Sequence, residues 1–192
     1  MDYTADSIIA YLKKHLPKER LHHTLGTWQA AQALASRYHI SQKKVMQAAL
    51  LHDAAKEMDD KELIRYILRN RIAVPERAKI IRHSPSLLHG FAAADIARRK
   101  FGIKDKDVLE AIALHTIAGP KMSALAKVIY LADITAPGRK FKKVQELRRL
   151  SLRNLDDAMR TALAAKIEYV LIKKQWLHPG AVAAWNDLLQ NR

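Results

Sequence analysis

Apolar residues recur every three or four positions along most of this chain, the spacing of helices that bury one face. The pattern predicts helices over residues 4–15, 23–38, 42–57, 59–70, 75–83, 87–101, 105–117, 123–135, 141–149, 154–173 and 180–190. No set of short alternating segments between turn signals suggests a sheet. We also find no internal repeat, low-complexity tract or long linker, so the pattern predicts an all-α fold in a single domain.

Several residues mark where these predicted helices begin and end. Asp105 and Ser123 stand where a side chain can accept the first free backbone N–H groups of a helix. Gly102 follows the end of the predicted helix 87–101. Gly119-Pro120 and Pro137-Gly138 stop two others, since proline cannot continue a helix.

Two of the predicted segments are apolar on nearly every side, Val45–Ala55 and Ala124–Ile134. A helix of this kind usually lies in the middle of a bundle. Both segments nevertheless carry an aspartate near their C-terminal end, Asp53 and Asp133. A buried carboxylate is costly unless it is paired or bound to a metal, and the helix dipole disfavours an anion at that end. Both positions therefore need a nearby cation.

Composition narrows the class of protein. The 192 residues are 49% hydrophobic, which suits one globular domain with a sizeable core. The chain has no cysteine, which excludes disulfides and thiolate metal sites and favours a reducing cytoplasm. We see no secretory signal and no window near the roughly 18 uninterrupted apolar residues of a membrane span, so we expect a soluble cytoplasmic protein with no membrane partner.

The net charge of +15 would attract nucleic acid, an anionic membrane or a small polyanion. Aromatic residues make up only 6% of the chain, and the basic residues are spread along it. Both facts argue against a nucleic-acid partner, which usually requires clustered charge and stacking aromatics. A solvated basic surface that steers a phosphorylated substrate is the better interpretation.

Nine histidines offer further candidate chemistry, and four of them lie at or near predicted helix ends: His23, His52, His89 and His115. Together with the two aspartates they make a nitrogen and oxygen donor set that suits zinc, iron, manganese or nickel. The lack of thiolates speaks against a structural zinc site. Six donors exceed what one catalytic ion needs, which suggests two ions with one carboxylate between them. Simple ion pairs of the aspartates with Lys56, Arg82 or Arg139 explain the pattern equally well.

Lys56 lies four residues after His52 and three after Asp53, on one side of the predicted helix 42–57. It can pair with Asp53, or it can neutralise a phosphate oxygen beside a metal centre. The two roles are compatible, because the lysine can exchange partners when substrate binds.

These residues stand in an order that resembles a known family, the two-metal HD-domain phosphohydrolases. The short words around them resemble the YqeK-like symmetrical bis(5′-nucleosyl)-tetraphosphatases, bacterial enzymes that split diadenosine tetraphosphate into two ADP. The resemblance runs from about Arg20 to Ala165. The matching words are R-x-x-H-T at Arg20–Thr24, A-x-L-H-D-x-A-K-E at Ala49–Glu57, L-L-H-G at Leu87–Gly90, A-I-x-x-H-T at Ala111–Thr116 and L-A-K-V-I-Y-L-A-D-I-T-A-P-G-R at Leu125–Arg139.

The resemblance implies an HD-domain helical bundle with an N-terminal helix at 1–17, the phosphohydrolase core at 18–140 and C-terminal helices packed on it at 141–192. It also implies a two-metal site of iron, with manganese or another divalent ion as alternatives. One ion would be held by His23, His52, Asp53 and Asp133. Asp53 would bridge to a second ion, held by His89 and His115.

The same resemblance assigns the reaction to Asp53 and Lys56 and makes diadenosine tetraphosphate the substrate, with ADP as product. Lys56 would contact phosphate directly. The other candidates for substrate binding are Arg20, Thr116, Lys121, Lys127 and Arg139. Two of these have ordinary alternatives, since Lys127 can extend its charge to solvent from an apolar helix and Thr116 can close its own helix.

Other functions remain open at this point. A different HD-domain activity, on deoxynucleotides, cyclic dinucleotides or guanosine alarmones, would share the fold and the metals. A basic helical nucleic-acid-binding protein and a metal-containing nucleotide sensor without turnover are the remaining alternatives. Trp176 and Trp185, in the C-terminal segment, can pack on the core or on a partner subunit, which leaves a homodimer open.

Overall fold

The computed structural model describes residues 3–141 and 143–190, and within these ranges it contains helices and no strand. The all-α prediction is confirmed. The helices are α1 (Ala5–His15), α2 (Lys18–Arg37), α3 (Gln42–Leu51), α4 (Asp60–Arg69), α5 (Arg77–His83), the 3₁₀ helix η1 (Pro85–Leu88), α6 (His89–Phe101), α7 (Lys106–Leu114), α8 (Ala124–Thr135), α9 (Val144–Arg153), α10 (Leu155–Ile172) and α11 (Pro179–Gln190).

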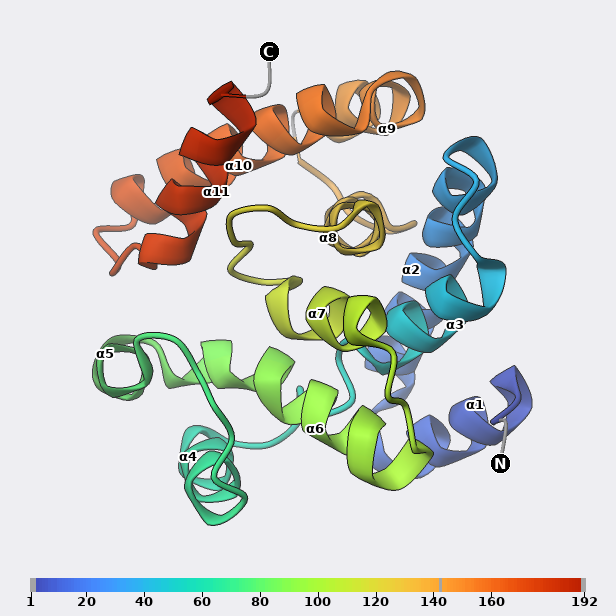
Figure 1. The fold of residues 1–192 in the computed structure, drawn as a ribbon, viewed down its shortest axis with the longest axis vertical. Helices are drawn as coiled ribbons and strands as arrows, with labels where there is room; N and C mark the ends of the chain where they lie inside the picture. The colour runs from blue at the N-terminus through green and yellow to red at the C-terminus, as the bar shows by residue number, and fades with distance from the viewer. Residues whose placement is uncertain (1–2, 142, 191–192) are drawn as a thin grey trace.

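Helix α8 lies in the middle of the bundle, where Figure 1 shows it almost end-on between α2, α7 and α10. Its side chains are buried on almost every side, including Leu125, Ile129 and Leu131. Helix α3 packs against α2 and α7 and buries Leu50 and Leu51 completely. Each such side chain stabilises the fold by about 1.5–3 kcal/mol, so the two most apolar segments form the core, as their pattern predicts.

The predicted helix ends are confirmed where a specific residue marks them. The Asp105 carboxylate accepts from the backbone N–H groups of Asp107 and Val108, and the Ser123 hydroxyl accepts from that of Ala126. Gly102 ends α6 in the left-handed region, at a φ of 61°.

The prediction of one helix over 42–57 is wrong, because α3 ends at Leu51. Residues 52–57 form successive turns, in which the N–H of Ala54 bonds the carbonyl of Leu51 and that of Lys56 bonds the carbonyl of Asp53. These are bonds between residues three apart, tighter than those of an α-helix. His52, Asp53 and Lys56 therefore do not share one side of a helix.

Three other helices, α2, α7 and α9, have ends three or more residues from the prediction, and α7 stops at Leu114 instead of residue 117. Helix α2 begins at Lys18, directly after Pro17, so His23 lies in its second turn and not at its start. Helix α9 begins and ends a few residues later than the predicted helix 141–149. Its Arg148 guanidinium donates to the carbonyls of Thr135 and Ala136 at 2.8 and 2.9 Å. These bonds satisfy carbonyls at the end of α8 and fix the chain that follows it.

The C-terminal helices pack on the central helix of the bundle. Helix α10 contacts α8, α9 and α11, and α9 also contacts α2. Trp176 and Trp185 are partly buried against the core of the same chain. Among the residues that the structure describes, no helix has the length and apolar character needed to cross a bilayer.

Candidate metal centre and substrate cavity

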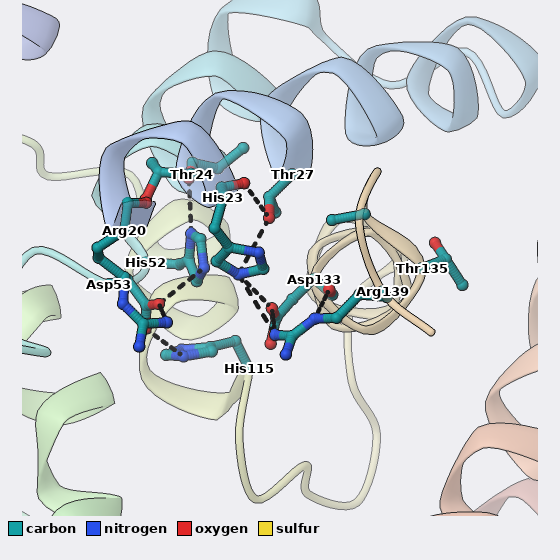
Figure 2. A network of polar contacts seen from close by, with 12 residues as sticks. Arg20, His23, Thr24, Thr27, His52, Asp53, His115, Asp133, Thr135 and Arg139 are labelled. Carbon is teal, nitrogen blue, oxygen red and sulfur yellow. Dashed lines mark hydrogen bonds and ion pairs between the residues drawn. The ribbon is translucent and has the colours of Figure 1, made fainter. Parts of the chain in front are cut away.

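The six predicted metal ligands come together in the structure, from five separate parts of the chain. All of them except His89 are labelled in Figure 2. Asp53 lies at their centre. Its Oδ1 is 3.2 Å from Nε2 of His89 and 3.4 Å from Nε2 of His115. Its Oδ2 is 3.6 Å from Nε2 of His52. One carboxylate thus faces imidazoles that reach it from the chain after α3, from the start of α6 and from the end of α7.

The remaining two ligands form the second half of the cluster. Nε2 of His23, on α2, lies 2.8 Å from Oδ1 of Asp133, on α8. Three groups of donor atoms lie within 4.8 Å of one another: His23–His52–Asp53, His52–His115–Asp133 and Asp53–His89–His115. Asp53 belongs to two groups that share no histidine, which is the position that a bridging carboxylate would hold.

Three of the imidazoles are oriented by their own chain. Nδ1 of His52, His89 and His115 bonds the carbonyl three residues earlier, at 2.7, 2.5 and 2.7 Å respectively. A carbonyl only accepts, so each Nδ1 carries a proton, and in the neutral ring Nε2 then presents a lone pair. Fixing the tautomer from the far side of the ring is how proteins prepare histidine for a metal.

The donor set also fits a divalent cation electrostatically. Nε2 of His52 is completely buried and has no hydrogen-bond partner, a condition that costs about 1–3 kcal/mol unless another group meets it. Burial lowers the pKa of His52 to about 4, so its ring is neutral at neutral pH. Burial raises the pKa of Asp53, but the nearby His52, His115 and His89 outweigh it and hold that pKa well below its usual range. Burial lowers the pKa of His89 as well, whereas the contact with Asp53 outweighs burial and raises the pKa of His115. A metal ion requires neutral imidazole ligands, so its binding would release the proton that Asp53 favours on His115.

Both aspartates also form ion pairs. Ion pairing and metal binding, the two explanations of their burial, are therefore compatible. Nη1 of Arg20 lies 3.1 Å from Oδ2 of Asp53, and Nη2 of Arg139 lies 2.7 Å from Oδ1 of Asp133. The partner of Asp53 is therefore Arg20, which the sequence pattern did not name for this pair. Arg20 leaves Oδ1 of Asp53 to the imidazoles of His89 and His115. It pairs with Oδ2, the oxygen that also faces His52.

A cavity of about 990 Å³ opens beside this cluster. Its walls include the proposed metal ligands His89, His115 and Asp133. Three of the predicted substrate contacts also line it: Lys56, Thr116 and Arg139. A volume of this size lies at the upper end of the range of small-molecule sites. The structure thus places candidate metal donors and phosphate-binding cations around one space.

The far wall of the cavity comes from residues for which the sequence predicted no role in substrate binding. They are His83, Phe141, Lys166, Tyr169, Trp176 and His178. Trp176 stacks on His83, with ring centroids 5.8 Å apart. In the sequence, Trp176 was the only sign of this wall, because it is an aromatic residue within the polar segment before α11. The contact between α5 and that segment joins residues separated by about half of the chain, which is why local pattern does not reveal it.

Two predicted substrate contacts lie elsewhere. Nζ of Lys127 bonds Oδ1 of Asp156 at 2.5 Å, between α8 and the first turn of α10. Lys121 precedes α8, and its backbone N–H donates to Asp187 on α11. Neither lysine is among the residues that line the cavity. Arg20 borders a second, smaller pocket together with His22 and His23.

Comparison with known proteins agrees with this geometry. A sequence model of the HD domain matches residues 20–138, well over half of the chain. The chain belongs to the HD-domain family. The matched range contains all six residues of the cluster and stops just before Arg139.

Relatives of this HD-domain protein carry a more specific name. Proteins from Halalkalibacterium halodurans and Bacillus subtilis, both named bis(5′-nucleosyl)-tetraphosphatase, symmetrical, are 36% and 33% identical to it. The alignments cover 93% of both chains in the first case, and 96% of this chain and 97% of the relative in the second. The resemblance of the sequence words to this family is confirmed.

A solved structure shows the same fold over its whole length. It is a crystal structure from Clostridium acetobutylicum, described as a predicted HD superfamily hydrolase involved in NAD metabolism. It is 35% identical, with a TM-score of 0.94 and complete coverage of both chains. The C-terminal helices that close the cavity are therefore shared with that protein.

Proposed function

We propose that this HD-domain protein hydrolyses dinucleoside tetraphosphates symmetrically, so that diadenosine tetraphosphate yields two ADP. One observation carries the proposal: the imidazoles that converge on Asp53 include His89 and His115, which line a cavity together with Lys56 and Arg139. The names of the two relatives support the substrate class. The lack of cysteine suits a reducing compartment, so we place the reaction in the cytoplasm.

Two divalent ions, with iron as the proposed metal, would be held by this donor set. His23, His52 and Asp133 would hold one, His89 and His115 the other, and Asp53 would bridge them. When bound, such a pair activates water at neutral pH and offsets the charge of phosphate oxygens. Manganese or another divalent ion suits the same donors.

The residues of the chain supply the rest of the reaction. Lys56 and Arg139 present cations to the polyphosphate, and Thr116 offers a hydroxyl to a phosphate oxygen. Water adds its oxygen to one of the two central phosphorus atoms, and the bond to the oxygen between those atoms breaks. One ADP leaves with that bridging oxygen and takes up a proton, and the other keeps the oxygen from water. Asp53 lies between the two groups of imidazoles and fixes their positions relative to each other for this step.

The decisive experiment is turnover of diadenosine tetraphosphate by purified, metal-loaded protein with the products resolved by chromatography. We expect ADP alone. ATP together with AMP would contradict symmetrical cleavage. A parallel panel of deoxynucleotides, cyclic dinucleotides and guanosine alarmones tests the other HD-domain activities, and faster turnover of any of these would reassign the substrate.

The homodimer stays a prediction. Leu171 and Ile172, near the end of α10, are among the most exposed apolar residues of the described chain. Sedimentation of the purified protein measures its state of association directly.

A further inference from the structure

A second pocket, of about 460 Å³, lies between the start of α2 and the turn after α8. We call it the α2 pocket. Its walls are formed by Pro17, Glu19, Arg20, His22, His23, Glu57, Pro137, Gly138 and Arg139. No role has been assigned to this pocket so far. Its volume lies within the range of small-molecule sites, and it is about half that of the main cavity.

The two spaces meet at the candidate metal cluster. His23 lines the α2 pocket, Asp133 lines the main cavity, and the two side chains are in contact at 2.8 Å. Arg139 lines both spaces. Its Nη2 lies 2.7 Å from Oδ1 of Asp133 and 3.3 Å from Nε2 of His23, so the guanidinium stands at the junction. Figure 2 shows these three side chains pointing toward one another.

We propose that the α2 pocket binds the second nucleoside diphosphate half of the substrate. The inference rests on the proposed function, because a substrate cut at its midpoint has two equal halves on either side of the bond that breaks. One half then lies in the main cavity beside Lys56. The other half passes the His23–Asp133 contact and enters the α2 pocket, so the scissile bond comes to rest at the cluster.

The side chains of the α2 pocket suit the parts of a nucleotide. Arg20 and Arg139 present forked donors that match phosphate oxygens. Glu19 and Glu57 are acceptors of the kind that bind ribose hydroxyls in nucleotide sites. His22 is exposed and offers a ring against which a base can stack. Phosphate contacts therefore lie nearest the cluster, because Arg20 and Arg139 are the residues paired with its carboxylates.

Binding stoichiometry tests this inference without turnover. Calorimetric titration of the metal-loaded wild-type chain with ADP, carried to millimolar concentration, should show two ADP per chain. Glu19→Trp places a large ring in the α2 pocket and should reduce this to one. Lys18→Trp is the matched control, because Lys18 is the neighbouring exposed residue and does not line the pocket. A single ADP on the wild-type chain, or two on Glu19→Trp, would overturn the proposal.

Kinetics then separate this inference from the proposed function. Adenosine 5′-tetraphosphate carries one nucleoside, and water should cut it to ADP and pyrophosphate with its base in the main cavity. Glu19→Trp should lower kcat/KM for diadenosine tetraphosphate about tenfold or more, the factor expected for losing one charged hydrogen bond. The loss on adenosine 5′-tetraphosphate should be smaller, because that substrate places no nucleoside in the α2 pocket, and Lys18→Trp should match the wild-type chain on both substrates. Equal losses on both substrates contradict the two-pocket arrangement, whereas no turnover by the wild-type chain contradicts the proposed function itself.

Discussion

Gly90 is the second residue of α6 and follows the candidate ligand His89. A Cβ at this position would lie 2.7 Å from the backbone oxygen of Ala113, on α7. Ordinary contact begins at 3.4 Å, so the Gly90→Ala variant must move the two helices apart by about 0.7 Å. Forcing extra volume into a packed contact costs about 1–3 kcal/mol of unfolding free energy.

The same displacement acts on the candidate metal centre. Nε2 of His89 and Nε2 of His115 lie 3.1 Å apart across this contact between α6 and α7. Metal–ligand distances tolerate deviations of only about 0.2 Å, several times less than the required shift. We therefore expect Gly90→Ala to lose the ion proposed for His89 and His115 and to retain the one proposed for His23 and His52.

Gly102→Ala is the control for a simple loss of stability. Gly102 ends the same helix with open space around it, but at a φ of 61°, where a side chain costs about 1–2 kcal/mol. Urea unfolding and elemental analysis, applied to both variants after identical metal loading, compare stability with metal content. We expect similar destabilisation of the two and loss of metal from Gly90→Ala alone. Equal metal content in the two variants would refute the argument that this contact sets the ligand spacing.

Three further outcomes follow from the site. Asp53→Ala should lose bound metal and turnover together in metal analysis and activity assays, and a variant with full activity would show that Asp53 is not the bridge. Lys56→Met should keep its metal but lose about ten- to a hundredfold in kcat/KM, the value of one charged hydrogen bond to phosphate. Lys127→Met should leave KM unchanged and lower the unfolding free energy by about 1 kcal/mol or less, since Lys127 pairs with Asp156 near the surface. A raised KM in the last variant would return Lys127 to the substrate site.

The sequence predicted the helices and the six clustered side chains because both depend on local pattern. Apolar periodicity identifies a buried helix such as α8, and the short words around His52 or His115 identify the ligands. Local pattern did not predict that α3 stops at Leu51. Residues 52–57 contain neither glycine nor proline, and Ala54 and Ala55 are good helix formers. Tertiary packing, which presents His52 and Asp53 to the cluster, overrides that propensity.

The cavity could not be predicted for a different reason. Its far wall combines α5 with the segment around Trp176, where His83 and Trp176 stack although they lie far apart in the chain. Lys127 is a second example with the same cause, a contact between residues far apart in the chain. Its position in a family word suggested phosphate, but its partner Asp156 lies 29 residues further along the chain. No spacing rule connects residues across two helices and a loop.

The bonds from the three imidazoles to carbonyls three residues earlier also bear on how the metal enters. Ala49 and Ile112 lie in the last turns of α3 and α7, where carbonyls have no partner within the helix. The Nδ1 side of each ring is thus fixed within four consecutive residues of the chain. Metal uptake should therefore be a rapid bimolecular step onto a prepared site, unlike that of domains that fold only around their ion. This local encoding also explains why words of a few letters were enough to identify the residues of the cluster.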